Sequence, residues 1–108
     1  MACTPEVLID VPDLNVSICT GCQRIGFAYK NILLGFDKAD FKDFVVSFTK
    51  IDFACKAIMF PSGEKHLVVN SAHRDIQFNF KKAEFESMCQ HLNQALTLLN
   101  AKEILSHH

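Results

Sequence analysis

The chain has 108 residues, the size of a single domain, and 49% of them are hydrophobic. Eleven basic and twelve acidic residues are mixed along it and give a formal net charge of −1. This balance argues against a nucleic-acid partner, which requires Lys and Arg clustered on one face. No apolar run approaches the roughly 18 residues that span a bilayer, so we expect no membrane partner. The first residues lack the basic start and apolar core of a secretory signal, which predicts a cytoplasmic protein.

The N-terminal part of the chain is predicted to be an extended lead-in followed by three strands. Residues 1–13 form the lead-in because Pro5 and Pro12 donate no backbone hydrogen bond, and the lead-in can add an edge strand. The single domain then occupies residues 14–108. Alternating apolar and polar residues predict strands at 14–18, 24–29 and 32–36. Lys30-Asn31 predicts a tight turn between the last two, since Asn tolerates a positive φ.

An amphipathic helix is predicted to follow residue 36. Asp37 is the expected N-cap, whose carboxylate would accept the free N–H groups of the first turn. Apolar residues then recur at helical spacing and form one stripe that we expect to pack on the sheet: Phe41, Phe44, Val45, Phe48 and Ile51.

The C-terminal part is predicted to contain three further strands and a second helix. Residues 53–60 are apolar on both alternations and are interpreted as a central, covered strand. Shorter strands are expected at 66–70 and 76–80. The second helix is predicted to run to about Asn100. Its N-cap is expected to be weaker, because Lys81 stands where Asp37 stood, with Glu84 partly offsetting this through the helix dipole.

A match between two parts of the chain organises these elements. Residues 31–48 resemble residues 75–92 without a gap, and pairs such as Phe36 and Phe80 lie 44 positions apart. We therefore predict an α+β, two-layer domain with an antiparallel sheet of five or six strands and two helices on one face. It is built from two βββα halves, about 14–51 and 53–100, related by pseudo-twofold symmetry. Leu33 and Val68 are expected to point away from the helices, which predicts a homodimer.

The most chemically specific feature is Cys19-Thr20-Gly21-Cys22. Two thiols separated by two residues match one half of a zinc knuckle, so zinc is the predicted cofactor. Cys3 and His66 are the candidate additional ligands, because the N-terminus can reach the turn and His66 overlays Cys22 in the 44-residue shift. A thiol–disulfide redox pair and inert turn residues are the alternatives. Five cysteines without a secretory signal favour reduced thiols.

The remaining candidates indicate no reaction. Cys55 and Cys89 fall at core-like positions, where a thiol behaves as a small hydrophobe. His91 lies beside the apolar stripe of the second helix and is expected at its boundary. There is no glycine-rich phosphate loop and no nucleophile elbow. The sequence thus favours a small, non-enzymatic binding or interaction domain, with a redox protein or a small-ligand-binding dimeric module, its pocket between helices and sheet, as alternatives.

Residues 19–44 resemble a family of small uncharacterised bacterial proteins. That family pairs a C-x-x-C with a strand and then an N-x-x-L-x-[FL]…F-x-x-F passage from strand to helix. The matching residues here are Cys19, Cys22, Asn31, Leu34, Phe36, Phe41 and Phe44. The resemblance implies no particular activity.

Overall fold

The computed structural model describes residues 4–71 and 75–106 and shows a mixed α+β protein. The elements follow one another as β1 (Pro5–Val11), β2 (Leu14–Cys19), β3 (Ile25–Tyr29), β4 (Ile32–Phe36), α1 (Lys38–Thr49), α2 (Phe53–Lys56), β5 (Ile58–Met59), β6 (Lys65–Asn70), β7 (Gln77–Phe80) and α3 (Lys82–Ser106). The predicted strands at 14–18, 32–36, 66–70 and 76–80 each coincide with a strand to within one residue at either end.

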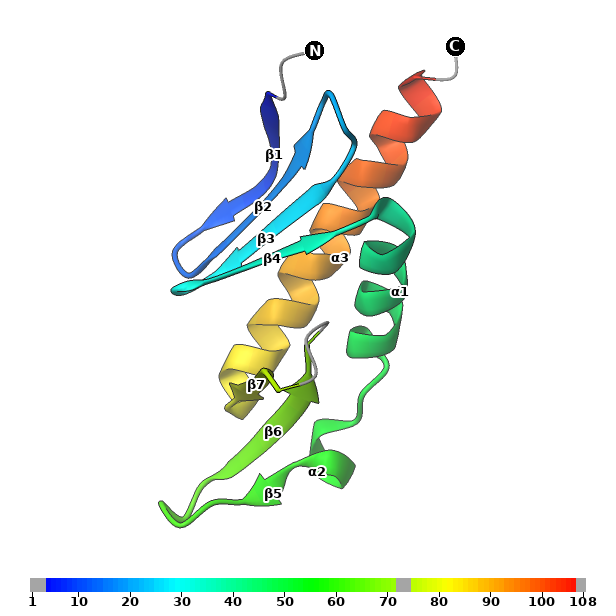
Figure 1. Ribbon diagram of the computed structural model, residues 1–108. Helices are drawn as coiled ribbons and strands as arrows, with labels where there is room; N and C mark the ends of the chain where they lie inside the picture. The colour runs from blue at the N-terminus through cyan, green and yellow to red at the C-terminus, as the bar shows by residue number, and fades with distance from the viewer. Residues whose placement is uncertain (1–3, 72–74, 107–108) are drawn as a thin grey trace.

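The strands form two antiparallel sheets. Strands β1 to β4 form a four-stranded sheet in chain order, and β5, β6 and β7 form a second sheet. The prediction of one sheet with five or six strands is therefore wrong in this respect. The long helix α3 passes along the four-stranded sheet and continues to the second sheet, with α1 beside it (Figure 1).

The segment at 53–60 differs most from its predicted conformation. It was predicted to be a central strand, but Phe53–Lys56 is a helical turn and only Ile58–Met59 is extended. The Asp52 side chain caps this turn by accepting the backbone N–H of Ala54 at 3.0 Å. A run that is apolar on both alternations lacks the period that separates a strand from a buried helix, so the local cap decides the conformation.

The predicted lead-in contributes an edge strand. Strand β1 pairs with β2, and the register shifts between Val7 and Ile9. This β-bulge turns two successive residues, Leu8 and Ile9, toward the interior. Residues 5–11 therefore share the core of the domain.

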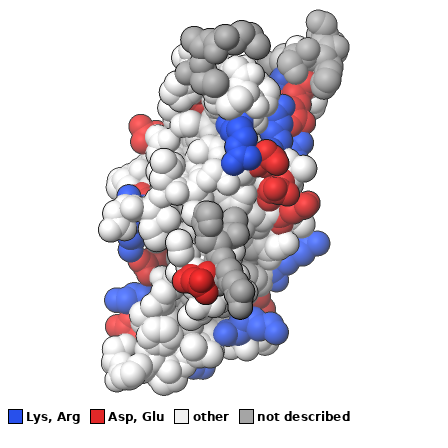
Figure 2. Space-filling model, viewed as in Figure 1, with Lys and Arg blue, Asp and Glu red and all other residues white. Residues whose placement is uncertain are grey.

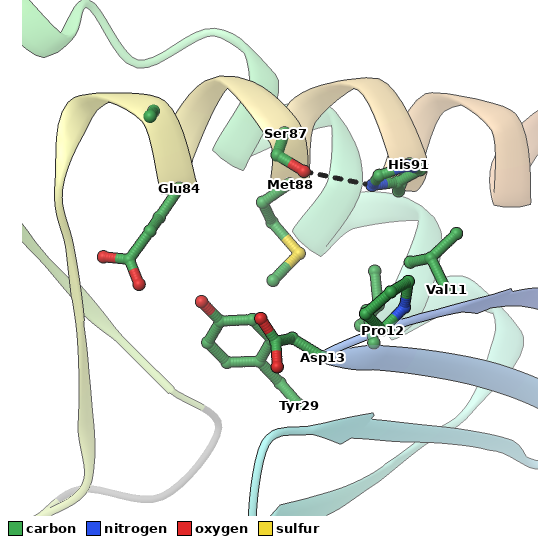
Figure 3. A pocket seen from close by; sticks show the side chains of 10 residues that line it. Val11, Pro12, Asp13, Tyr29, Glu84, Ser87, Met88 and His91 are labelled. Atoms are coloured by element: carbon green, nitrogen blue, oxygen red, sulfur yellow. Dashed lines mark hydrogen bonds between the residues drawn. The ribbon is translucent and has the colours of Figure 1, made fainter.

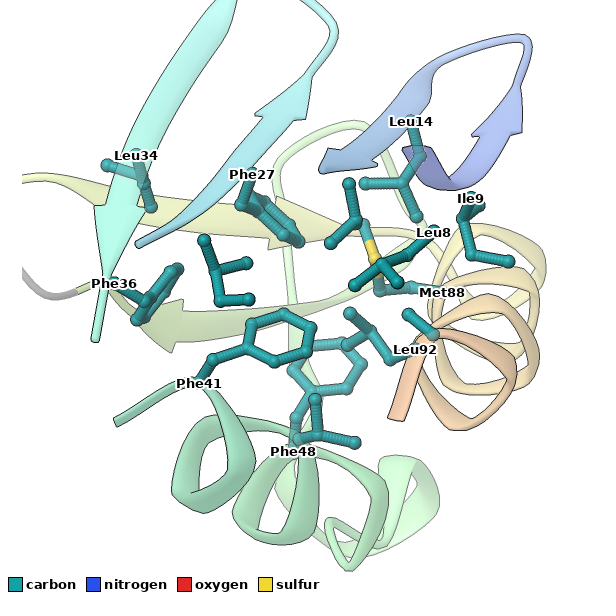
Figure 4. Packing of buried hydrophobic residues seen from close by; sticks show 14 of the residues in the cluster. Leu8, Ile9, Leu14, Phe27, Leu34, Phe36, Phe41, Phe48, Met88 and Leu92 are labelled. Carbon is teal, nitrogen blue, oxygen red and sulfur yellow. The ribbon is translucent and has the colours of Figure 1, made fainter. Parts of the chain in front are cut away.

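One aromatic core joins the sheets and the two long helices. Phe27, 1% exposed, makes edge-to-face contacts with Phe36, Phe44 and Phe78, at ring-centroid separations of 5.9–6.2 Å. Phe27, Phe41 and Phe48 fill the space between the strands and the helices (Figure 4). The core includes Phe78 from β7, so burial holds the second sheet to the first.

The strand-to-helix passages β4–α1 and β7–α3 match at the level of burial. Strands β4 and β7 end 44 positions apart, and α1 and α3 begin 44 positions apart. The paired positions that lie in the core are Leu34 and Phe78, Phe36 and Phe80, Phe41 and Phe85, and Phe48 and Leu92. The two passages differ in length, because α3 continues to Ser106, beyond the predicted end near Asn100.

The start of α1 differs from the prediction. Asp37 is its N-cap residue, but the Asp37 side chain makes no capping hydrogen bond. Its carboxylate instead pairs with the Arg24 guanidinium at 2.6 Å, and that guanidinium lies over Gly35 on the outer face of the sheet. Arg24, the residue just before β3, thus binds the carboxylate that the sequence predicted to cap the helix.

Charged side chains of both signs are interspersed on the face shown in Figure 2. Two ion pairs link α3 to other elements, since Glu103 pairs with Lys42 of α1 at 2.8 Å and Lys102 pairs with Glu6 of β1. Among the described residues, no helix is both long and apolar enough to cross a membrane.

Candidate functional site

A cavity of about 350 Å³ lies between the N-terminal half of α3 and two turns of the four-stranded sheet. Its lining comes from three separate segments: Val11, Pro12, Asp13 and Leu14 around the β1–β2 turn, Tyr29 at the end of β3, and Ala83, Glu84, Ser87, Met88 and His91 on α3. The α3 side chains face the turn and Tyr29 across the opening (Figure 3). The cavity therefore exists only once helix and sheet have packed together.

The β3–β4 turn positions the sheet side of the cavity. Tyr29 pairs with Ile32, which leaves Lys30 and Asn31 as a two-residue turn. The residue with positive φ is Lys30, at 54°, whereas the sequence pointed to Asn31. The Lys30 N–H donates to the Asp13 carbonyl oxygen at 2.8 Å. This bond holds the β1–β2 turn against the β3–β4 turn, so that Asp13 and Tyr29 line the same cavity.

Glu84 secures the helix side. One carboxylate oxygen accepts the backbone N–H of Lys81 at 2.8 Å, and the other accepts the Lys30 ammonium at 2.9 Å. This first bond is the part of a capping box in which the carboxylate of the third helical residue accepts the N–H of the N-cap residue. We expected the cap of α3 to be weaker than that of α1, yet α3 has a side-chain capping bond and α1 has none. These two hydrogen bonds, the backbone bond foremost, lower the pKa of Glu84. The Glu84 carboxylate is therefore ionised at neutral pH.

Tyr29 supplies a neutral hydroxyl and an aromatic face. Burial raises the pKa of Tyr29, and the nearby charge of Glu84 raises it further. The Lys30 ammonium lies 5.4 Å from the centroid of the Tyr29 ring. The hydrogen bond to Glu84 raises the pKa of Lys30, so the ammonium stays charged.

His91 and Ser87 lie one turn apart on α3. The Ser87 hydroxyl and His91 Nδ1 are 3.3 Å apart (Figure 3). His91 is half-buried, in agreement with its predicted boundary position, but the sequence did not place it in a cavity. Buried Met88 lies between Glu84 and His91, and its side chain points toward Tyr29. Apolar surface thus separates the polar groups at the two ends of the cavity.

Asp13 is the one carboxylate of the cavity that remains open. Within residues 4–71 and 75–106, no side chain or backbone group forms a hydrogen bond or ion pair with the Asp13 carboxylate. The cavity therefore offers a free carboxylate, a phenol, an imidazole and an apolar wall. Such an arrangement suits recognition of a small molecule, since ligand cavities pair apolar linings with a few convergent polar groups.

The CTGC segment forms the turn between β2 and β3, away from this cavity. The Gln23 N–H donates to the Cys19 carbonyl oxygen at 2.9 Å, and Gln23 has a positive φ of 63°. The Cys19 and Cys22 thiols do not form a disulfide with each other. Within the described ranges, no three His, Cys, Asp or Glu side chains are grouped so as to hold a metal ion.

Of the other predicted zinc ligands, the described one, His66, is not brought to that turn. His66 lies on β6, at the opposite end of the molecule from the β2–β3 turn (Figure 1). Its ring stacks on Phe60 at 4.3 Å, and its Nδ1 lies 2.7 Å from the Asn79 amide oxygen. Cys3 lies outside the described residues. The prediction of zinc at Cys19 and Cys22 therefore stays a prediction.

The two cysteines predicted to lie in the core differ from each other. Cys55 is exposed, so that prediction is wrong for this residue, and a hydrogen bond to Asp52 raises the pKa of its thiol. Cys89 is half-buried against the core, and burial raises the pKa of its thiol. The helical turn at 53–56 is what turns Cys55 outward.

The residues behind the predicted homodimer also differ. Leu33 is 75% exposed on the outer face of the four-stranded sheet, as expected. Val68 instead lines a second cavity, of about 490 Å³, together with Phe44 and Phe48 of α1. The homodimer stays a prediction. The described residues that line this second cavity include one charged side chain, Lys56, and no carboxylate or histidine.

Comparison with known proteins places the chain in a family. A model described as a family of unknown function (DUF6686) matches residues 1–107. The chain belongs to the DUF6686 family. This agrees with the resemblance to an uncharacterised family that the sequence shows. No curated protein and no solved structure matches the chain.

Sequence reasoning missed most of the cavity of this DUF6686 protein. Two signals were present in the chain: Tyr29 is its single tyrosine, and Ser87 and His91 have the i, i+4 spacing of neighbours on a helix. Neither signal identifies the partner segment across the cavity. Asp13 and Glu84 are 71 positions apart in the chain, and only the packing of α3 on the sheet brings them to the same cavity.

Proposed function

We propose that this DUF6686 protein is a non-enzymatic domain that binds a small ligand in the cavity between α3 and the turns of the four-stranded sheet. The observation that carries the proposal is convergence: Asp13, Tyr29, Glu84 and His91 come from three segments and line one partly apolar cavity. A volume of about 350 Å³ falls at the lower end of the range for small-molecule sites.

Binding is favoured over catalysis by the way the polar groups are engaged. Ser87 and His91 are the nearest approach to a nucleophile and a base, at 3.3 Å. A working pair also needs a third group that orients the base. In the part of the chain that the structure describes, no hydrogen bond reaches the second ring nitrogen of His91. The pair is therefore treated as a local helix contact that contributes a polar edge to the cavity.

Tyr29 makes the proposal directly testable. The chain contains one tyrosine and no tryptophan, so its tyrosine fluorescence reports on the surroundings of Tyr29, which lines the cavity. We would titrate the full chain with hexanol, hexylamine and hexanoate, which share an aliphatic body and differ in the head group. The proposal expects a saturable change in Tyr29 fluorescence with at least one of the three.

A pair of variants separates the cavity from the rest of the helix. Ser87→Phe places a ring in the cavity, whereas Gln90→Phe places the same ring on an exposed position of α3 that does not line it. The saturable signal should be lost in Ser87→Phe and kept in Gln90→Phe. Absence of saturation with all three probes, or an equal response in both variants, would overturn the proposal.

A further inference from the structure

Building on the proposed ligand site, we infer that its ligand is an amphipathic monocation: an ammonium or guanidinium group on a small apolar body. The group that recognises the charge is the Asp13 carboxylate, with the Tyr29 hydroxyl and ring beside it. The apolar body lies along Met88 and the β1–β2 turn.

The charges around the cavity leave one negative charge uncompensated. Asp13 and Glu84 are the two carboxylates in the lining, and the Lys30 ammonium donates a hydrogen bond to Glu84 and attracts Asp13 only through space. Glu84 is fully engaged, since each of its oxygens accepts a hydrogen bond. The Lys30 ammonium forms its ion pair with Glu84, and among the described residues the Asp13 carboxylate forms no ion pair of its own. A ligand with one positive charge restores the balance.

An anionic ligand is disfavoured by the same groups. The N-terminus of α3 borders the cavity, and free N–H groups at such a terminus attract anions. Here Glu84 already accepts the Lys81 N–H and places its own negative charge at that terminus. An incoming anion would meet Glu84 and Asp13 together, and like charges at this range repel.

Lys30 shows that these surroundings accept an ammonium. Its charged group donates to Glu84 at 2.9 Å and lies 5.4 Å from the Tyr29 ring centroid, within the range of a cation–π contact. A ligand cation at Asp13 would approach the same tyrosine from the β1–β2 turn. Met88, Leu14 and Val11 also line the cavity, and their apolar side chains suit an aliphatic or aromatic body.

The three six-carbon probes test whether the cavity prefers a positively charged ligand. We expect hexylamine to bind about fivefold more tightly than hexanol, the gain from one partly exposed ion pair, and hexanoate to bind most weakly. The advantage of hexylamine should shrink as salt is added, because screening weakens exposed ion pairs. Dissociation constants come from the Tyr29 fluorescence titration of the full chain.

Two matched variants locate the charge. Asp13→Asn should reduce hexylamine binding to the level of hexanol, whereas Asp10→Asn, on the outer face of β1, should leave the fivefold ratio unchanged. Hexanol or hexanoate binding as tightly as hexylamine would overturn the monocation and leave the ligand site standing. So would a ratio that survives Asp13→Asn. Failure of all three probes to bind would instead remove the site itself.

Discussion

The passages β4–α1 and β7–α3 bury the same positions but use their polar residues differently. In β4–α1, the carboxylate at the helix start is paired with Arg24, which precedes β3, and the helix ends after 12 residues. In β7–α3, Glu84 caps the helix, binds Lys30 and helps to line a cavity, and the helix continues for 25 residues. The core is thus similar in the two passages, and the candidate site lies where they differ.

The difference has a physical cause. Few residues can replace a buried phenylalanine, because a larger side chain does not fit the packed core and a smaller one loses apolar contacts. A polar residue at a helix start can bind a backbone N–H of the helix or a charged side chain nearby, and these interactions contribute similar free energies. Asp40 and Glu84 are 44 positions apart and both lie in the first turn of a helix, yet only Glu84 has the extra methylene with which it reaches the backbone of Lys81.

The largest expected effect on stability tests the buried aromatic positions that the two passages share. Phe36→Ala and Phe80→Ala should each lower the free energy of unfolding by about 3–5 kcal/mol, because both rings are buried among other aromatic rings. Urea unfolding of each variant measures the change. Ile76→Ala, at a side chain 42% exposed, is the control and should cost less than about 1 kcal/mol. A low cost for one phenylalanine and a high cost for the other would break the equivalence of the two passages.

A smaller effect on stability tests the carboxylates at the two helix starts, where the passages differ. Glu84→Ala should lower the free energy of unfolding by about 1–2 kcal/mol, because it removes a capping bond and the Lys30 ion pair. Asp40→Ala, the matched position in α1, should cost about 0.5 kcal/mol or less, the worth of a carboxylate near a helix dipole. Glu84→Gln keeps an acceptor for Lys81 and should fall between them. Equal costs for the two alanine variants would contradict the assigned cap.

The same carboxylate predicts a pH dependence. The pKa of Glu84 is lowered from its ordinary value of 4.5 on folding, so its ionised form stabilises the folded state above that pH. This contribution is lost as the pH falls below about 4.5 and the folded carboxylate takes up its proton. The stability difference between the wild type and Glu84→Gln should therefore be constant near neutral pH and shrink in acid. Urea unfolding at a series of pH values measures it, and a difference that grows in acid would be the contrary result.

The smallest effect concerns reactivity rather than stability. Exposed Cys22 should be alkylated faster than Cys55 and Cys89, whose thiol pKa values are raised, because the thiolate is the reactive form. The predicted zinc site adds that excess zinc should slow alkylation at Cys19 and Cys22 and leave Cys55 unaffected. Mass spectrometry of timed reactions reads each cysteine separately. Unchanged rates at Cys19 and Cys22 in zinc would remove the zinc prediction.

The elements that could be predicted are those with a clean period. The strand Ile32–Phe36 has the predicted bounds, and Gln77–Phe80 starts one residue later than predicted. Their inward residues alternate with period two. Residues 53–60 could not be predicted in the same way, since every position of that run is compatible with burial and the Asp52 cap depends on local geometry. The cavity lay beyond prediction because its members, Asp13, Tyr29 and Glu84, share no pattern along the chain.

By itself, the sequence determined the two strand-to-helix passages, because apolar periods of two and then 3.6 are local properties of the backbone. It also determined the paired positions of Phe36 and Phe80 in the core. Only the tertiary structure decided that the strands divide into two sheets and that Lys30 binds Glu84 across 54 positions of chain. Bonds between distant segments depend on how the helices dock, and that docking places the open carboxylate of Asp13 at the mouth of a cavity.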